Sequence, residues 1–111
     1  MTDKAELSLL LDYYGSFLTT RQAELTRMSA DDDMSLAEIA EQVGVSRQAV
    51  RDSLKKASDQ LLSMEESLGL IHRDMQLRKV ISKLEAAKEA EASEARLLIG
   101  DSISEILSVI R

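Results

Sequence analysis

The sequence predicts an all-α protein, made of a small helical domain with a helix-turn-helix and of a C-terminal helical extension. Three observations indicate this class. The 111 residues include no proline and only four glycines, so few positions interrupt a helix. Apolar residues recur at intervals of three and four, as on one face of a helix, and alternating β-branched runs are scarce. We expect the helical domain to span residues 1–84 and the extension to span residues 85–111.

The composition excludes several classes of protein. The chain has no cysteine, which removes disulfide bonds, thiol catalysis and thiolate zinc sites. No run approaches the roughly 18 apolar residues of a membrane span, and the N-terminus lacks the pattern of a signal peptide. We therefore expect a cytoplasmic protein without membrane insertion. With 20 acidic and 14 basic side chains the net charge is −6, which disfavours nonspecific coating of nucleic acid.

Two helices are expected in the first third of the chain. The apolar face of the first helix, which ends near Gly15, consists of Leu7, Leu10, Leu11 and Tyr14. Thr19 and Gln22 have the spacing of a capping box, so a second helix begins there and fades by Ala30. The acidic run at residues 31–33 then predicts a solvated turn.

The three aromatic residues cluster at Tyr13, Tyr14 and Phe17. Stacking on nucleic-acid bases is one interpretation of such a cluster. We instead expect Tyr14 and Phe17 to pack in the interior, which leaves Tyr13 as the more exposed ring.

Residues 35–62 predict the helix-turn-helix. Ser35 and Glu38 form a second capping box that opens a short helix, and Gly44 ends it. Ser46 then caps a longer helix. The inward stripe of that helix, spaced by 4, 3, 4, 3 and 4 residues, is formed by Val50, Leu54, Ala57, Leu61, Met64 and Leu68. Short helix, glycine turn and striped helix in this order are typical of a helix-turn-helix.

Most of the local positive charge lies on the second helix of this pair. The predicted nucleic-acid-binding residues are Arg47, Gln48, Arg51, Lys55 and Lys56. Arginine can bind guanine or phosphate, glutamine can bind adenine and lysine can bind phosphate, which are the contacts of a recognition helix. The alternative interpretation is an ordinary solvated face opposite an apolar stripe. Asp52 stands among the basic residues and opposes phosphate binding.

Three segments carry a resemblance to a known family. They are residues 11–22, with the sequence LDYYGSFLTTRQ, residues 35–40, SLAEIA, and residues 44–50, GVSRQAV. Together they resemble the YlxM family of small bacterial helical proteins, and the middle third is similar to region 4 of bacterial sigma factors. The resemblance covers roughly residues 5–84. It implies a helix-turn-helix protein associated by genomic neighbourhood with the signal recognition particle, the RNA and GTPase machine that targets nascent membrane proteins.

The sequence offers no candidate for catalysis. The four glycines stand apart, at positions 15, 44, 69 and 100, so no loop resembles a phosphate cradle. The single histidine, His72, has no partner at catalytic or metal-ligand spacing. We expect no enzyme activity, no cofactor and no metal site.

The C-terminal third predicts two apolar segments separated by a polar spacer. Leu77, Val80, Ile81 and Leu84 form a face that suits a helix folding back. Residues 85–96 contain only alanine among apolar residues, which predicts a solvent-crossing helix or a frayed linker. The predicted dimer or partner interface consists of Ile99, Ile103, Ile106 and Ile110. This segment can pack on its own domain, dock on a partner or form a homodimer, and we expect the homodimer.

Two functions follow as hypotheses. The first is a non-catalytic accessory protein that regulates the signal recognition particle by binding its protein, its RNA or both. The second is a sigma-like transcription regulator that binds duplex DNA. Binding assays against these ligands at one salt concentration separate the two.

Overall fold

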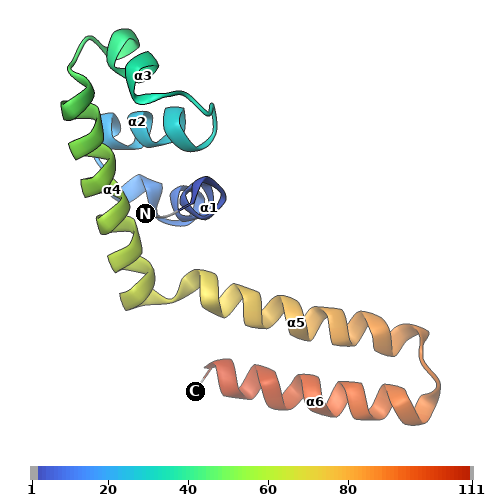
Figure 1. The fold of residues 1–111 in the computed structure, drawn as a ribbon. Coiled ribbons are helices and arrows are strands. Elements are labelled where there is room, and N and C mark those ends of the chain that lie inside the picture. Colours follow the sequence, from blue (N-terminus) through green and yellow to red (C-terminus); the bar gives the residue numbers. More distant parts are fainter. Residues whose placement is uncertain (1–2, 111) are drawn as a thin grey trace. The chain divides into compact units, whose positions relative to one another are not determined.

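The computed structural model describes residues 3–110, and these residues form six α-helices, one short 3-10 helix and no strand. The elements in order are α1 (Lys4–Tyr14), the 3-10 helix η1 (Gly15–Phe17), α2 (Thr20–Ala30), α3 (Leu36–Val43), α4 (Arg47–Leu68), α5 (Leu70–Glu89) and α6 (Ala92–Ile110) (Figure 1). The predicted all-α class is confirmed.

The chain divides into two compact units, residues 1–69 and residues 70–111. Gly69 ends α4 in the left-handed region with a φ of 62°, a conformation that suits glycine because it has no Cβ. The sequence analysis placed a boundary between residues 84 and 85, whereas α5 continues through both residues.

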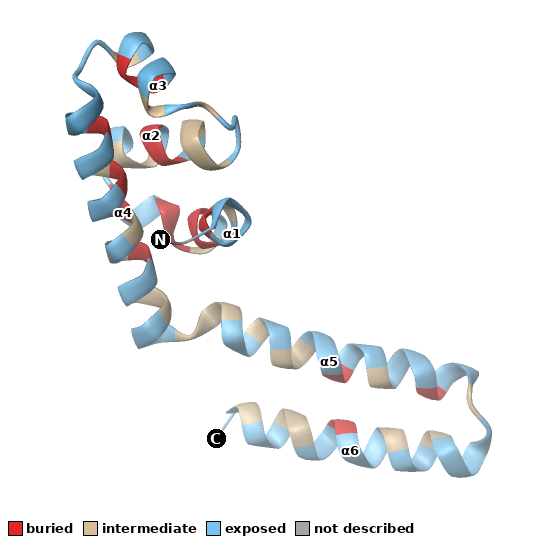
Figure 2. Ribbon diagram, in the orientation of Figure 1, coloured by how far each residue is buried: buried red, intermediate tan, exposed pale blue. Residues whose placement is uncertain are grey.

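The first unit is a bundle of four helices in which α4 packs against α1, α2 and α3. Figure 2 shows the buried residues on the sides of these helices that face one another. One core cluster lies under the helix-turn-helix and consists of Leu25, Ile39, Ala40, Val50 and Leu54, with Met28 and Met34 packed against it. A second buried group joins α1 to α4 through Leu7, Leu10, Leu11, Tyr14, Ala57 and Leu61. The predicted face of the first helix and the predicted stripe from Val50 to Leu61 are thus buried. The end of that stripe is not, because Met64 is half-buried and Leu68 is 58% exposed.

The predicted start signals of the helices are confirmed. Thr19 and Gln22 form a reciprocal capping box at α2, with both hydrogen bonds at 3.1 Å. Ser35 and Glu38 do the same at α3, again at 3.1 Å. Each box satisfies two backbone N–H donors that a helix N-terminus would otherwise leave open.

The prediction for Phe17 is wrong. Tyr14 is fully buried as expected, but the Phe17 side chain is 62% exposed. Phe17 is the last residue of η1, and the chain turns from a 3-10 helix into extended backbone at Leu18. Because of this turn Leu18, which is only 8% exposed, enters the core in place of Phe17.

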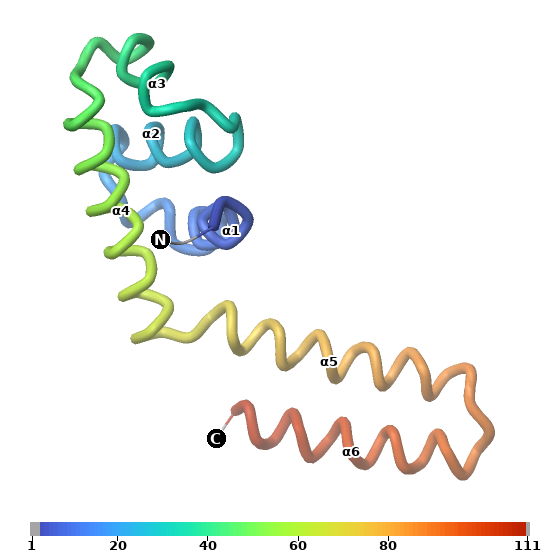
Figure 3. The backbone as a smooth tube through the Cα atoms, viewed as in Figure 1, coloured from blue at the N-terminus to red at the C-terminus, as the bar shows by residue number. Residues whose placement is uncertain are grey.

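The second unit is an antiparallel hairpin of α5 and α6, which lie side by side in Figure 3. The chain reverses at residues 90 and 91, so the spacer predicted for residues 85–96 does not form a single span. Its first residues complete α5 and its last residues begin α6. None of the helices described in residues 3–110 is both long enough and apolar enough to cross a membrane.

Candidate nucleic-acid interface

The helix-turn-helix is formed by α3, a turn at residues 44–46 and α4. Gly44 has a φ of 79°, and its N–H and that of Val45 both donate to the Ala40 carbonyl, at 2.9 and 3.1 Å. The Ser46 hydroxyl then accepts the Ala49 N–H at 3.0 Å and starts α4. The turn is therefore held by local hydrogen bonds on both sides, which sets the direction in which α4 leaves it.

All five predicted binding residues are exposed on α4, and Gln48, Arg51, Lys55 and Lys56 point away from the buried side at Val50 and Leu54, whereas Arg47 is exposed at the first turn of the helix next to that side. Arg47, Arg51 and Lys55 follow one another at intervals of four residues and form a continuous strip along the helix, here called the basic row. Gln48 lies beside the row on the outermost side of the helix. The structure thus brings four of the five residues onto one side of the helix.

Lys56 lies elsewhere. It is nine residues from Arg47, and at 100° per residue the two side chains leave α4 in roughly opposite directions. Lys56 therefore lies on the flank that also carries Ala49. A single ligand seated on the basic row does not reach Lys56 equally well.

Two of the predicted residues already have acidic partners one helical turn away. The Gln48 Nε2 atom donates to the Asp52 carboxylate at 2.8 Å, and Lys55 pairs with Asp59 at 3.0 Å. These exposed contacts are weak, because solvent screens the charges. A phosphate near Lys55 must nevertheless compete with Asp59. Asp59 was not among the residues predicted for this surface, although its i,i+4 spacing from Lys55 indicates the pair.

A shallow hollow of about 240 Å³ adjoins the turn on the opposite flank from the basic row. Its walls are Arg21, Leu25, Val43, Val45, Ala49 and Ser53. Val45, an apolar residue of the turn, is 42% exposed and borders this hollow. The sequence pattern shows Val45 as apolar without showing that it lies at the edge of the core.

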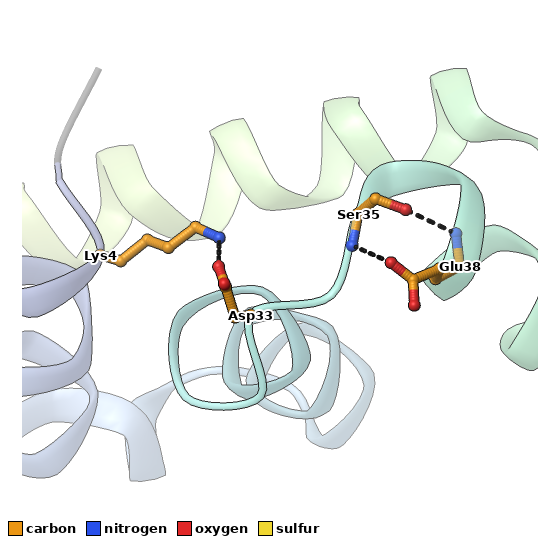
Figure 4. A network of polar contacts seen from close by, with 4 residues as sticks. All are labelled: Lys4, Asp33, Ser35 and Glu38. Atoms are coloured by element: carbon orange, nitrogen blue, oxygen red, sulfur yellow. Dashed lines mark hydrogen bonds and ion pairs between the residues drawn. The ribbon is translucent and has the colours of Figure 1, made fainter.

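The acidic run at residues 31–33 is not merely solvated. The Ser8 hydroxyl donates to the Asp31 carboxylate at 2.6 Å, and Lys4 pairs with Asp33 (Figure 4). Both contacts tie α1 to the loop that leads into α3. Among residues 3–110 no group of three acidic, histidine or cysteine side chains is arranged to hold a metal ion.

Two carboxylates of this region have perturbed acidity. The hydrogen bond from Lys4, reinforced by its charge, holds the pKa of Asp33 below its usual value of 3.8. At the α3 cap, hydrogen bonds from the Ser35 backbone and hydroxyl hold the pKa of Glu38 below 4.5. Figure 4 shows both carboxylates on the segment that precedes and opens α3. Ionised carboxylates therefore stabilise the entry into the helix-turn-helix.

The fold and the exposed basic row of α4 define the class as a helix-turn-helix protein. The chain belongs to the family UPF0122, whose model, described as "Putative helix-turn-helix protein, YlxM / p13 like", matches residues 1–99. The predicted resemblance to the YlxM family is confirmed.

Several UPF0122 proteins are similar over most of their length. A protein of Clostridium botulinum is 46% identical over 90 residues, which are 80% of this chain and 83% of the relative. One of Desulforamulus reducens is 44% identical over 98 residues, 85% and 84% of the two chains. One of Symbiobacterium thermophilum is 40% identical over 97 residues, 86% and 91% of the two chains.

Proposed function

We propose that this chain is a non-catalytic accessory protein that binds nucleic acid through the basic row of α4 and regulates the signal recognition particle. The observation that carries the proposal is the position of Arg47, Arg51 and Lys55, which form one exposed strip on the second helix of a helix-turn-helix. In proteins of this class that helix lies against nucleic acid. The strip has the chemistry needed to bind phosphate, because arginine and lysine carry permanent positive charge at neutral pH.

The signal recognition particle enters the proposal through the family resemblance, which implies an association with that machine. Its RNA presents phosphates that suit the basic row. The net charge of −6 works against unspecific attraction over the whole surface. Binding therefore depends on local contact at α4 and on any protein surface of the particle that the chain contacts.

A second candidate is a sigma-like transcription regulator that binds duplex DNA. The observation that favours it is Gln48, which stands next to Arg47 at the exposed start of α4. An amide at this position can contact adenine in a major groove. Asp52 weighs against it, because the same carboxylate that holds Gln48 at 2.8 Å repels the phosphate backbone.

The test compares three ligands at one salt concentration. Fluorescence anisotropy is measured for particle RNA and for random duplex DNA, and pull-down for the particle GTPase, each with the wild-type chain and with Arg51→Ala. The accessory role predicts binding to particle RNA that is stronger than to duplex DNA and that Arg51→Ala weakens. Stronger binding to duplex DNA favours the regulator. Binding to the GTPase alone, unaffected by Arg51→Ala, contradicts nucleic-acid binding through the basic row.

A further inference from the structure

The C-terminal hairpin has almost no interior of its own. Within residues 70–110 only Val80, Ala87 and Ser102 are buried, and two of these three side chains are small. A hairpin of two helices cannot by itself surround an apolar core, because each helix covers the other on one side only. The hairpin therefore lacks the burial that normally stabilises helices of this length.

Large aliphatic side chains remain exposed along both helices of the hairpin. They include Ile81 and Leu84 of α5, which are 53% and 37% exposed. On α6 they include Ile99, Ile103, Leu107 and Ile110, with exposed fractions of 43%, 54%, 44% and 70%. Three of the four predicted interface residues belong to this group, whereas Ile106 is half-buried.

These six side chains share one side of the hairpin. At 100° per residue, Ile81 and Leu84 lie on one flank of the α5 side centred on Val80. Ile99 and Ile103 lie on the corresponding flank of the α6 side centred on Ser102. Viewed from one end of the hairpin, one helix runs away from the viewer and the other toward the viewer, so their residues progress in opposite senses of rotation. The flank of α5 with Ile81 and Leu84 and the flank of α6 with Ile99 and Ile103 therefore lie on the same side of the hairpin. We call this surface, made of Ile81, Leu84, Ile99, Ile103, Leu107 and Ile110, the hairpin face.

The other side of the hairpin is polar at the corresponding seam. Lys83 of α5 and Glu105 of α6 form an ion pair there, with side chains that are 36% and 38% exposed. By the same projection, Leu97, at 71% exposure, lies outside the hairpin face. Met75, at 57% exposure, lies outside the face as well, so most but not all of the exposed apolar side chains of the hairpin gather on the hairpin face, as expected for an interface.

We propose that the hairpin face is covered by the hairpin face of a second copy of this chain, giving a symmetric four-helix bundle. Each copy offers the equivalent of about three fully exposed aliphatic side chains, on the order of 600 Å², against about 800 Å² per partner in a standard interface. A second hairpin is matched to the face in length and in aliphatic character. A second copy of the chain is also present whenever the protein is synthesised. A partner that the hairpin needs for its own stability must be available in this way. This dimer does not depend on the proposed function.

A two-fold axis that lies between the two hairpin faces and crosses α6 at its middle brings Ile103 close to its own copy, because residues 99 and 110 bracket it on α6. The chain has no cysteine, so one introduced cysteine per chain reports a single position. Treatment of Ile103→Cys with a flexible bis-maleimide should give a covalent dimer. Leu97→Cys, outside the face, is the matched control and should remain largely uncrosslinked.

Sedimentation equilibrium of the full chain tests the same surface without a cross-linking reagent. The wild-type chain and Leu97→Lys should both be dimeric at tens of micromolar. Ile103→Lys should raise the dimer dissociation constant by more than about 100-fold, because symmetry places two buried charges in each interface. Circular dichroism checks that the helices of each variant remain. A monomeric wild-type chain overturns the proposal and leaves the face to a different protein. So does equal weakening of the dimer by Leu97→Lys and Ile103→Lys, or equal cross-linking of Leu97→Cys and Ile103→Cys.

Discussion

The hydroxyl of Tyr14 donates a hydrogen bond to the Oε1 atom of Glu65 across 2.6 Å. The two residues are 51 positions apart, and the bond joins the end of α1 to the last part of α4. The Tyr14 ring is fully buried between these helices, so the bond places a polar group at the edge of an apolar contact. It thereby fixes α1 against the helix that carries the basic row.

Replacing Tyr14 by Phe should lower the free energy of unfolding by about 1.5 to 3 kcal/mol, the usual range for a hydrogen bond to a charged group. The phenyl ring keeps the packing, whereas the half-buried Glu65 carboxylate loses this donor. Urea denaturation followed by circular dichroism measures the loss. A double-mutant cycle with Glu65→Gln isolates the pair, and a coupling energy close to zero contradicts the assignment.

Gly44→Ala should destabilise the helix-turn-helix by about 1 to 2 kcal/mol, because its φ of 79° brings a Cβ close to the following carbonyl oxygen. Gly15→Ala is the control. Its φ is −59°, and an added Cβ would make an ordinary contact of 3.5 Å with the Leu11 Cδ2 atom. Thermal unfolding should therefore separate the two variants. A loss for Gly15→Ala as large as that for Gly44→Ala would contradict the role of the turn.

Stability should decrease as the pH falls below about 4.5, because the pKa values of Glu38 and Asp33 are lowered in the folded chain. Above the unfolded values both carboxylates are ionised in both states, and their favourable contacts are fully present. Protonation at lower pH removes those contacts from the folded state. Urea midpoints measured from pH 6 down to pH 3 follow this loss. We expect most of it within about one pH unit of the pKa values that the two carboxylates have in the unfolded chain.

Glu38→Gln is a matched variant for the pH experiment. Glutamine can keep the reciprocal hydrogen bond of the capping box, but it does not titrate. The variant should therefore fold at neutral pH and lose part of the pH dependence. An unchanged pH profile would exclude Glu38 as one of its sources.

The basic row should be visible in the salt dependence of nucleic-acid binding. If Arg51 neutralises one phosphate, Arg51→Ala should reduce the slope of log affinity against log salt by about one unit. Lys56→Ala removes the same charge from the opposite flank and should reduce it less. Equal reductions for both variants would mean that the ligand does not distinguish the two sides of α4. Gln48→Ala should alter sequence preference with little change in slope.

The carboxylates beside the basic row provide a test with the opposite sign. Asp52→Asn and Asp59→Asn each remove a negative charge from the side of α4 that carries Gln48 and Lys55. Both should strengthen phosphate binding, because repulsion is lost and Lys55 no longer pairs with an anion. The same binding assay at low salt measures the gain. No change in either variant would indicate that α4 carries only a solvated face.

The sequence by itself determined the helical class, the caps of α2 and α3 and the glycine turn of the helix-turn-helix. These features depend on hydrogen bonds between residues three to five positions apart, so the local pattern is sufficient. The exposure of Arg51 and Lys55 also followed from helical periodicity around Val50, whereas that of Arg47, one turn before Val50, did not.

Only the tertiary structure decided which residues from distant segments meet. It exposed Phe17, tied the acidic run to α1 and reversed the chain within the predicted spacer. It also left Ile103 exposed on the hairpin face while Ile106, three residues later, is half-buried. Periodicity assigns a residue to a side of its own helix, but the burial of that side depends on where a neighbouring helix packs, and contacts remote in sequence determine that position.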